Sequence, residues 1–380
     1  MEKYKPIVGI DGNEANVVNR VGVNNYAYEV LQNIHKLEDE WKSNFEVVVY
    51  LKHQPLPHMP KPTKNFKYVV LMGGGQWILK TLMPHLYLTA HKPAVFWTPS
   101  HYIPPFAPMP RVCSIMDLGY LEFTEQFKKY DFWQLKLWTA WSIAHAQKVL
   151  AISETTRKDI VKRYPSAREK TITTLLGYDN QNYPPRTNSE EVKRVLNKYS
   201  IGLKYILFMS TLKPSKNIEG LLKAWSSVEK KYPDTQLVVA GKKGWLFDSI
   251  FSLAQKLQLQ ERVVFTDFID EADKPILVAN ARCFVLPSFW EGFGLDVVSS
   301  MACGVPVVVS DRGSLPEVAG KAGIVVNPDD THDIAQGIER VLSATKQEFS
   351  KMSKAGVEQA TFFSWQKTAR ETIQILRSLL

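Results

Sequence analysis

Short runs of apolar residues alternate with longer amphipathic stretches along this chain of 380 residues. Runs that are apolar throughout, without alternation, are typical of parallel β-strands covered on both faces. The stretches between them have the periodicity of amphipathic α-helices. The predicted strands are Ile7–Ile10, Val47–Leu51, Tyr68–Met72, Ala94–Trp97, Val112–Met116, Val149–Ile152, Tyr205–Met209, Leu237–Ala240, Val263–Phe265, Cys283–Leu286, Val305–Val309 and Ile324–Val326. The predicted helices are Asn25–Leu37, Trp133–Ala146, Ile218–Lys230, Ser249–Leu257 and Ser364–Leu380, the last with Ser364 as its N-cap.

The alternation of strand and helix occurs twice, which predicts two doubly wound α/β domains. A chain of 380 residues also exceeds what one hydrophobic core usually serves. The polar stretch 177–200, which contains Pro184 and Pro185, is the best candidate for a linker. We therefore expect an N-terminal domain at 1–180, a linker at 181–200, a C-terminal domain at 201–360 and a last helix at 361–380. Because open α/β sheets bind ligands at the carboxyl ends of their strands, one site is expected in a cleft between the two facing domains.

Composition and charge limit the class of protein and its partners. Apolar residues make up 45% of the chain and charged residues 22%, as in an ordinary globular protein and unlike a disordered one. The formal net charge of +9 favours anionic partners such as phosphorylated ligands, acidic membrane surfaces or nucleic acid. Nucleic acid is not expected, because the positive charge is dispersed and no reading motif is present.

The cysteines and the N-terminus predict a cytoplasmic protein. Cys113, Cys283 and Cys303 lie in or beside apolar runs without a C-x-x-C pair, which predicts buried free thiols and a reducing compartment. The N-terminal segment lacks the apolar region of a signal peptide. No apolar run approaches the length of about 18 residues that a membrane-spanning helix needs.

The most informative motif is the stretch PSFWEGFGLDVVSSMACGVP at 287–306, which follows a predicted strand. Gly292 and Gly294 lie in a turn, and an apolar helix-like run follows as far as Gly304. A strand, a glycine-bearing turn and a helix direct backbone N–H groups and the positive end of the helix dipole at a ligand, which suits a phosphate. Glu291 would repel a phosphate, so it more plausibly faces hydroxyl groups. The motif therefore predicts a ligand that carries both phosphate and sugar, and the alternative is an ordinary turn with a solvated Glu291.

A second candidate cluster, Lys213, Lys216 and Asn217, comes directly after the first strand of the second domain. Two ammonium groups at this position would neutralise the negative charge of a diphosphate as it leaves the group to which it was bonded. The alternative is that both lysines are solvated loop residues.

Several segments in matching order resemble the retaining glycosyltransferases of family four, which are mannosyltransferase-like group 1 glycosyl transferases. In the second half they are ILFMSTLKPSKNIEGLLKAW (206–225), LVVAGKKGW (237–245), VLPSFWEGFGLDVVSSMACGVPVVVSDRGSLPEVAG (285–320) and FSWQKTARETI (363–373). Weaker echoes in the first half are ID (10–11), GVNNY (22–26), PSHYIPP (99–105), IMDLGYLEF (115–123) and VLAISETTRKDI (149–160). The resemblance implies the GT-B fold, with two Rossmann-like domains and a C-terminal helix that returns to the first domain.

The same resemblance implies a retaining hexosyltransferase of polysaccharide biosynthesis. It implies a UDP- or GDP-sugar as donor substrate and a hydroxyl of a glycan or a lipid-linked acceptor. No cofactor and no catalytic metal are expected, because the nucleotide sugar is itself a substrate.

The resemblance also implies roles for individual residues. Glu291 would contact the donor sugar, and the turn at Gly292, with the amides of Phe293, Gly294 and Leu295, would approach its hydroxyls and the distal phosphate.

Two residues of the first domain complete the implied site. The loop at Gly22 would close over the donor phosphates, although a plain turn glycine is the alternative. Asp117 would lie near the acceptor hydroxyl, with a helix N-cap as its alternative.

Three positions depart from the family pattern. Ser299 stands where a second glutamate usually holds the ribose hydroxyls, and a hydroxyl offers a weaker, neutral hydrogen bond in place of charge-assisted ones. Met116 stands where a histidine is common, and Ser215 where an arginine is frequent. These losses leave open an alternative function, a non-catalytic nucleotide- or sugar-binding relative that acts as the partner of another transferase.

The stretch FKKYDFWQLKLWTAW at 127–141 allows two interpretations. Trp133, Leu137 and Trp141 recur at helical spacing, and Lys128, Lys129 and Lys136 add charge. An amphipathic helix on an anionic membrane surface is one interpretation, which would make the protein peripheral on the inner face of the membrane. Core packing against the first-domain sheet is the other.

Overall fold

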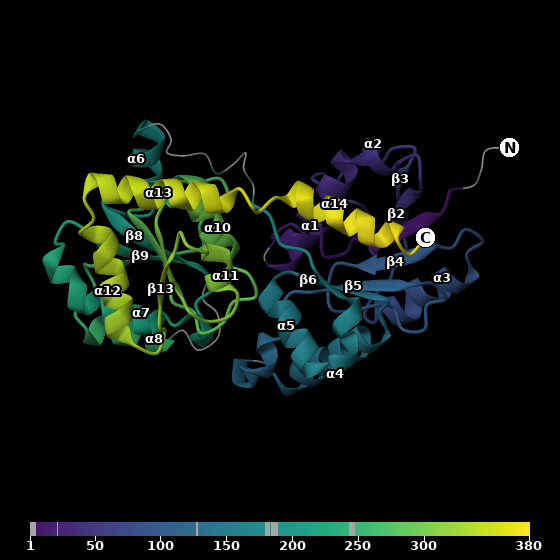
Figure 1. Cartoon of the computed structure of the whole chain (residues 1–380), viewed down its shortest axis with the longest axis horizontal. Helices are drawn as coiled ribbons and strands as arrows, with labels where there is room; N and C mark the ends of the chain where they lie inside the picture. The colour runs from purple at the N-terminus through teal and green to yellow at the C-terminus, as the bar shows by residue number, and fades with distance from the viewer. Residues whose placement is uncertain (1–4, 21, 127, 179–182, 184–188, 243–247) are drawn as a thin grey trace. The chain divides into compact units, whose positions relative to one another are not determined.

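The computed structural model describes residues 5–20, 22–126, 128–178, 183, 189–242 and 248–380. The chain divides into two compact units: unit 1 is Met1–Gly177 with Ser364–Leu380, and unit 2 is Tyr178–Phe363. Each unit is a parallel sheet between layers of helices (Figure 1).

Unit 1 contains a seven-stranded sheet in the order β3-β2-β1-β4-β5-β6-β7, in which every pairing is parallel. The strand order reverses between β1 and β4, the position where open α/β sheets bind ligands. The strands are β1 (Ile7–Asp11), β2 (Glu46–Leu51), β3 (Phe66–Val70), β4 (Val95–Thr98), β5 (Arg111–Ile115), β6 (Lys148–Ala151) and β7 (Thr171–Thr173).

Helices cover both faces of the unit 1 sheet. Helices α1 and α14 pack against each other on one face, while α4 and α5 share a core cluster with β5 and β6 on the other (Figure 1). The α-helices are α1 (Val23–Lys36), α2 (Glu38–Trp41), α3 (Met83–Leu88), α4 (Lys129–His145), α5 (Glu154–Arg163) and α14 (Trp365–Arg377). The shorter helical segments are η1 (Ile78–Leu82), η2 (Gly119–Leu121), η3 (Thr124–Gln126) and η4 (Pro165–Lys170).

Unit 2 contains a six-stranded parallel sheet in the order β10-β9-β8-β11-β12-β13. Its order reverses between β8 and β11, so the loops after these two neighbouring strands meet at the carboxyl edge of the sheet. The strands are β8 (Tyr205–Met209), β9 (Gln236–Ala240), β10 (Val263–Asp267), β11 (Cys283–Leu286), β12 (Val307–Ser310) and β13 (Ile324–Val326).

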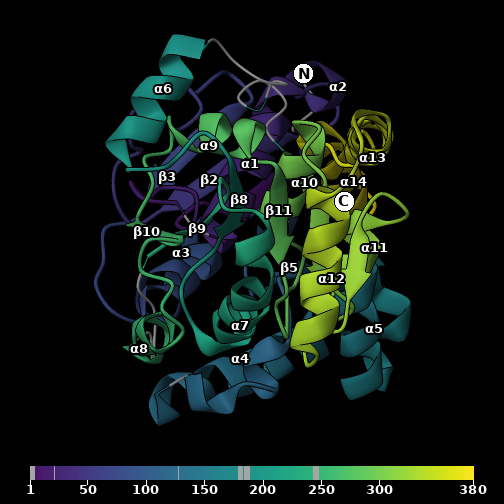
Figure 2. The ribbon, with the colours of Figure 1, turned by 90° about the vertical axis from the view of Figure 1, so that its left-hand side faces the viewer.

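Helices also cover both faces of the unit 2 sheet. Helix α7 packs against α8 and α12 on one face, and α10 packs against α9, α11 and α13 on the other (Figure 2). The helices are α6 (Ser189–Lys198), α7 (Ile218–Val228), α8 (Asp248–Lys256), α9 (Lys274–Asn280), α10 (Leu295–Ala302), α11 (Leu315–Ala319), α12 (Thr331–Leu342) and α13 (Lys346–Ala360), with the 3₁₀ segments η5 (Pro214–Lys216) and η6 (Glu229–Lys231).

The twelve predicted strands are present to within two residues at each end, and the predicted helices are also present. The hydroxyl of Ser364 accepts a hydrogen bond from the Lys367 amide, so Ser364 caps α14 as predicted. Helix α14 belongs to unit 1, in agreement with the expected return of the C-terminal helix.

Two sequence-based assignments need correction. Strand β7 was not predicted, because Thr171 and Thr173 make this short edge strand polar rather than continuously apolar. The predicted linker at 181–200 contains helix α6, whose strong amphipathic pattern packs it against α9, and the unit boundary falls after Gly177. Pro184 and Pro185 lie outside the described residues, as do residues 243–245 of the second quoted segment.

The three cysteines are buried and unpaired, as predicted. Within the described part of the chain, no helix is both long and apolar enough to cross a membrane.

Candidate functional site

The glycine-bearing turn between β11 and α10 has the geometry that the sequence predicted. Strand β11 is fully buried, and α10 begins directly after Gly294. Gly294 has φ 98° and ψ 57°, and a Cβ atom at this position would lie 2.8 Å from Leu315 Cδ2. The positive φ favours glycine here, and a larger residue would also have to displace the flexible end of the Leu315 side chain. The turn therefore brings the backbone of the α10 N-terminus to the carboxyl edge of the sheet.

Glu291 and Lys216 form an ion pair at this edge. Lys216 Nζ lies 2.5 Å from Glu291 Oε1, and the side chains are only 11% and 15% exposed. Ser288 Oγ donates a second hydrogen bond to the same carboxylate oxygen, at 3.1 Å. The ion pair joins two of the predicted catalytic residues, from the loops after neighbouring strands β8 and β11.

The loop after β12 fixes the backbone of the turn that carries Glu291. Both the amide and the hydroxyl of Ser314 donate to Glu291 O, at 3.1 and 3.0 Å, and the hydroxyl also donates to Phe293 O at 3.0 Å. Gly313 has φ 58°, and a Cβ atom there would lie 2.5 Å from Glu291 O. Phe293 anchors the turn from its other side by packing edge-on against Phe363, with ring centroids 5.6 Å apart. The turn is therefore held by backbone contacts that do not use the Glu291 carboxylate.

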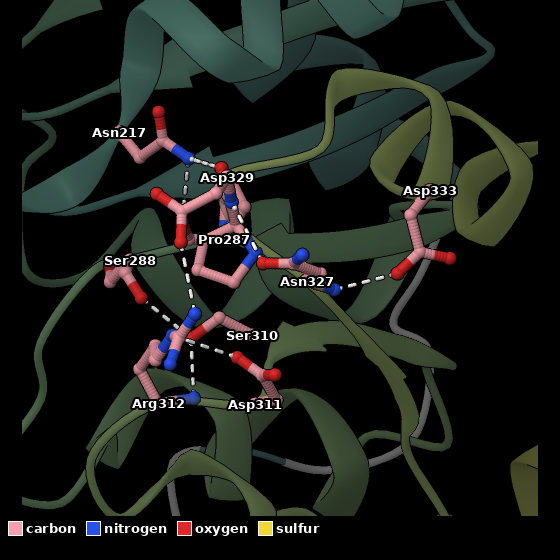
Figure 3. Close-up of polar contacts among 10 residues, drawn as sticks. Asn217, Pro287, Ser288, Ser310, Asp311, Arg312, Asn327, Asp329 and Asp333 are labelled. Atoms are coloured by element: carbon pink, nitrogen blue, oxygen red, sulfur yellow. Dashed lines mark hydrogen bonds and ion pairs between the residues drawn. The ribbon is translucent and has the colours of Figure 1, made fainter.

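Asn217 joins three loops at the carboxyl edge (Figure 3). Its side-chain nitrogen donates to Pro287 O at 3.1 Å and to Pro328 O at 2.7 Å, which links the loops after β8, β11 and β13. Its backbone is left-handed, with φ 53°, a conformation that asparagine tolerates. Both N–H groups of this amide thus serve the fold, and a direct contact with a donor stays a prediction for its oxygen.

Arg312 and Ser310 extend this network of loops (Figure 3). Ser310 Oγ donates to Ser288 O at 2.6 Å and accepts from the Arg312 amide at 3.2 Å. The Arg312 guanidinium lies 2.9 Å from Asp329 and 3.1 Å from Asp311. The loops after β11, β12 and β13 are therefore tied together beside the turn.

A cavity of about 340 Å³ opens beside this network. Its lining includes Lys213, Lys223, Phe289 and Asp329, together with residues 218–220 at the start of α7. Lys213 is half-buried and precedes η5, so it lies in the same loop as Lys216. The charges of the two lining lysines are balanced by the carboxylates of Glu219 and Asp329, so the N-terminus of α7 is the feature of this cavity that favours an anion.

Helix α10 contributes Leu295, Asp296 and Ser299. Ser299 is 6% exposed, so its hydroxyl is nearly enclosed by the fold. Burial raises the pKa of the Asp296 carboxyl to about 6, with Lys274 opposing the rise and Glu291 adding to it. Asp296 therefore lies in the same electrostatic environment as the ion pair, although the sequence analysis did not single it out.

Two predicted site residues belong to unit 1. Gly22 is exposed, has φ 48° and ψ −112°, and precedes α1, which no side chain caps. Asp117 Oδ1 accepts a hydrogen bond from the Gly119 amide at 2.7 Å, but the residue that precedes η2 is Leu118, and no side chain caps this short helix. The N-cap interpretation of Asp117 is therefore wrong, and its acceptor role stays a prediction.

His101 lies near Asp117 in unit 1, and it was also missed from the sequence. Burial lowers the pKa of His101, and the Asp117 carboxylate opposes this effect. Its Nδ1 atom is buried and has no hydrogen-bond partner among the described residues. An imidazole therefore lies beside Asp117 even though Met116 replaces the histidine expected from the resemblance.

Within the described ranges, no group of three or more His, Cys, Asp or Glu side chains is placed to hold a metal ion. The independence from metal and cofactor stays a prediction.

A family model decides the classification. The model described as "Glycosyl transferases group 1" matches residues 170–359, which is half of the chain. The chain belongs to the group 1 glycosyl transferases. The O-antigen chain mannosyltransferase B of Escherichia coli is 34% identical to this group 1 member over 244 residues. That alignment covers 63% of this chain and 62% of the relative, less than two thirds of its length.

Solved structures support the same fold over the whole length of this group 1 chain. Sucrose-phosphate synthase from Thermosynechococcus elongatus superimposes with a TM-score of 0.76 at 20% identity, covering 99% of both chains. Anabaena HepE, in complex with UDP and glucose, superimposes with a TM-score of 0.72 at 19% identity, covering 98% of this chain and 99% of that one. The fold is therefore GT-B, with two Rossmann-like units, as the resemblance implied.

Proposed function

We propose that this protein is a retaining glycosyltransferase that uses a nucleoside-diphosphate sugar, needs no metal and glycosylates a hydroxyl of a glycan or lipid-linked acceptor. The membership in group 1 and the mannosyltransferase relative support sugar transfer. The observation that carries the proposal is the Lys216–Glu291 ion pair beside the N-terminus of α10. A carboxylate, an ammonium group and a helix N-terminus at one sheet edge suit a ligand with both hydroxyls and phosphates.

The proposed chemistry assigns a distinct task to each group. The Glu291 carboxylate accepts hydrogen bonds from hydroxyls of the donor sugar. The Lys216 ammonium group has three N–H donors, so it can pair with Glu291 and also approach the departing diphosphate. Lys213, in the same loop, adds a second positive charge on the phosphate side.

The transfer itself is proposed to occur on one face of the sugar. The bond between the anomeric carbon and the phosphate oxygen breaks, and a bond to the acceptor oxygen forms on the same face. The acceptor proton passes to the departing phosphate oxygen, so no protein base is required. The donor is proposed to be a UDP- or GDP-sugar, and HepE, a protein of the same fold, was solved with UDP and glucose.

Replacement of Glu291 tests this proposal. We expect Glu291→Ala to lower transfer by about a hundredfold or more while the fold is retained. The matched control is Glu358→Ala, which removes an exposed carboxylate on α13 in the same unit. The measurement is release of nucleoside diphosphate from UDP-, GDP- and ADP-sugars, with circular dichroism as the check of folding. Unchanged turnover in Glu291→Ala would refute the assignment.

Ser299, which stands where the family usually has a second glutamate, leaves one alternative open, a binding protein without turnover. A neutral hydroxyl at this position holds ribose more weakly than a carboxylate. Calorimetry against UDP, GDP and ADP, followed by the release assay, separates the two functions. Tight nucleotide binding without any consumption of donor would favour the binding protein.

A further inference from the structure

Helix α4 presents a row of apolar side chains to solvent on its outer side. Tyr130, Trp133 and Leu137 are 76%, 52% and 63% exposed. Their spacing of three and four residues places them on one face of the helix. The opposite side of α4 is buried in the core of unit 1, where Ile143 and Phe132 pack. Core packing, the alternative for this stretch, is therefore wrong for Trp133 and Leu137 but confirmed for Trp141, which packs against the same core.

The apolar row continues beyond these three residues. Trp141, one turn after Leu137, lies at the edge of the row, because it is half-buried against the core of unit 1 and meets the exposed Phe106 edge-on, with ring centroids 5.8 Å apart. Phe106 is itself 72% exposed, and the hydroxyl of Tyr87 donates to its carbonyl oxygen. We call Tyr130, Trp133, Leu137, Trp141 and Phe106 the α4 face.

Positive charges border the α4 face. Lys128 and Lys129 are exposed at the start of the helix. Lys136 Nζ lies 4.8 Å from the centroid of the Trp133 ring, and the Arg111 guanidinium lies 5.7 Å from that of Trp141. Asp131 is the acidic residue within α4. The border is thus predominantly basic, as is the whole chain, with its formal net charge of +9.

From this arrangement we infer that the α4 face docks on an anionic lipid membrane. Tryptophan and tyrosine rings suit the boundary between headgroups and acyl chains, and lysines beside them attract anionic headgroups. A second copy of this chain is a poorer occupant, because two copies of a basic face repel each other. A lipid-linked acceptor, as in the proposed function, would lie in such a membrane. The inference rests on the proposed function for this point alone, because the exposed side chains and the charges argue for membrane binding by themselves.

Vesicle co-sedimentation of the full chain tests the inference. The vesicles contain phosphatidylcholine alone or phosphatidylcholine with anionic phosphatidylglycerol. We expect binding to the anionic vesicles that weakens as salt is raised. Lys128→Gln with Lys129→Gln should weaken it by about fivefold per lysine. Trp133→Ser with Leu137→Ser should weaken it by tenfold or more, because the exposed row no longer enters the lipid.

Matched controls change the same kinds of residue elsewhere on the surface. Leu203→Ser removes a side chain that is 78% exposed on unit 2, and Lys351→Gln with Lys354→Gln removes two exposed lysines of α13. Both controls should bind anionic vesicles like the parent chain. Glu291→Ala should also bind normally, so a failure of the catalytic proposal is distinguishable from a failure of this one.

Three results would overturn the inference. The first is equal sedimentation with and without anionic lipid, and the second is equal binding by the Trp133→Ser, Leu137→Ser variant and the parent. The third is a dimer in analytical ultracentrifugation that this variant abolishes, which would assign the α4 face to a second copy.

Discussion

The ion pair between Lys216 and Glu291 leads to a quantitative prediction about stability. Lys216→Met keeps most of the side-chain stem but removes the positive charge. The Glu291 carboxylate, which is 15% exposed in the parent chain, then keeps Ser288 as its remaining side-chain donor among the described residues. Breaking a buried pair by removing one partner typically costs about 3–5 kcal/mol. Because Ser288 still donates and both groups reach solvent, we expect a loss at the low end, about 3 kcal/mol.

Neutralising both partners should cost much less than neutralising one. In the variant with Lys216→Met and Glu291→Gln, no unpaired charge is left in the site, and Ser288 can still donate to the amide oxygen. Replacement of a buried ion pair by neutral groups is often close to neutral in stability. With a loss of about 3 kcal/mol for Lys216→Met and a nearly neutral double variant, the double-mutant cycle should give an interaction energy of about 3 kcal/mol or more between the two positions.

Local hydrogen exchange is the suitable assay, because a chain of two units need not unfold in one transition. A loss of about 3 kcal/mol corresponds to roughly a hundredfold faster exchange where reclosing is faster than chemical exchange, so that the rate follows the opening equilibrium. Peptides from β11 and α10 should show this change in Lys216→Met, while peptides from β1 and β2 in unit 1 serve as an internal control. Strictly additive effects of the two substitutions would refute the ion pair.

Two further predictions concern the turn and helix α10. Gly294→Ala should destabilise unit 2 by about 2–3 kcal/mol, because the backbone has a positive φ and the new Cβ would lie 2.8 Å from Leu315 Cδ2, which must shift. Gly22→Ala should cost about 1–2 kcal/mol, because its φ is also positive but the space around its Cβ is open. Equal losses in urea denaturation would contradict this ranking. Burial raises the pKa of Asp296 from 3.8 to about 6, so the folded state binds the proton more tightly, and stability should fall as pH rises from about 4 to 6. Asp296→Asn should remove this slope and raise stability at pH 7 by about 1–2 kcal/mol; an unchanged stability curve against pH would show that Asp296 is not responsible.

The architecture could be predicted from the sequence because the strands of both sheets are covered on two faces. Continuous apolar runs such as Cys283–Leu286 and Tyr205–Met209 therefore identify strands directly. Strand β7 could not be found in this way, since it is short, lies at the sheet edge and carries threonines. Helix α6 was hidden for a different reason, because the prolines before it made its surroundings look like a linker.

The site could be predicted only in part. Glu291, Gly294 and Lys216 follow strands in motifs with a direct chemical interpretation, so their positions could be anticipated. Ser314 was missed although the quoted segment contained it, because its role depends on hydrogen bonds to the backbone of a turn 21 to 23 residues earlier. Asp296 was missed because its raised pKa depends on burial, which the spacing of residues does not report.

The fold does not require the Lys216–Glu291 ion pair, and this bears on the role of this edge of the sheet. The turn is already held through backbone contacts by Ser314 and Gly313, and the loops are joined by Asn217. Two charged groups that are only 11% and 15% exposed carry a desolvation cost that apolar side chains of similar volume would avoid. Stability therefore gives no reason for this pair, whereas a ligand with hydroxyls and phosphates does. For this reason the ion pair favours a ligand-binding role for this edge of the sheet over a purely structural one, and consumption of the donor separates a transferase from a binding protein.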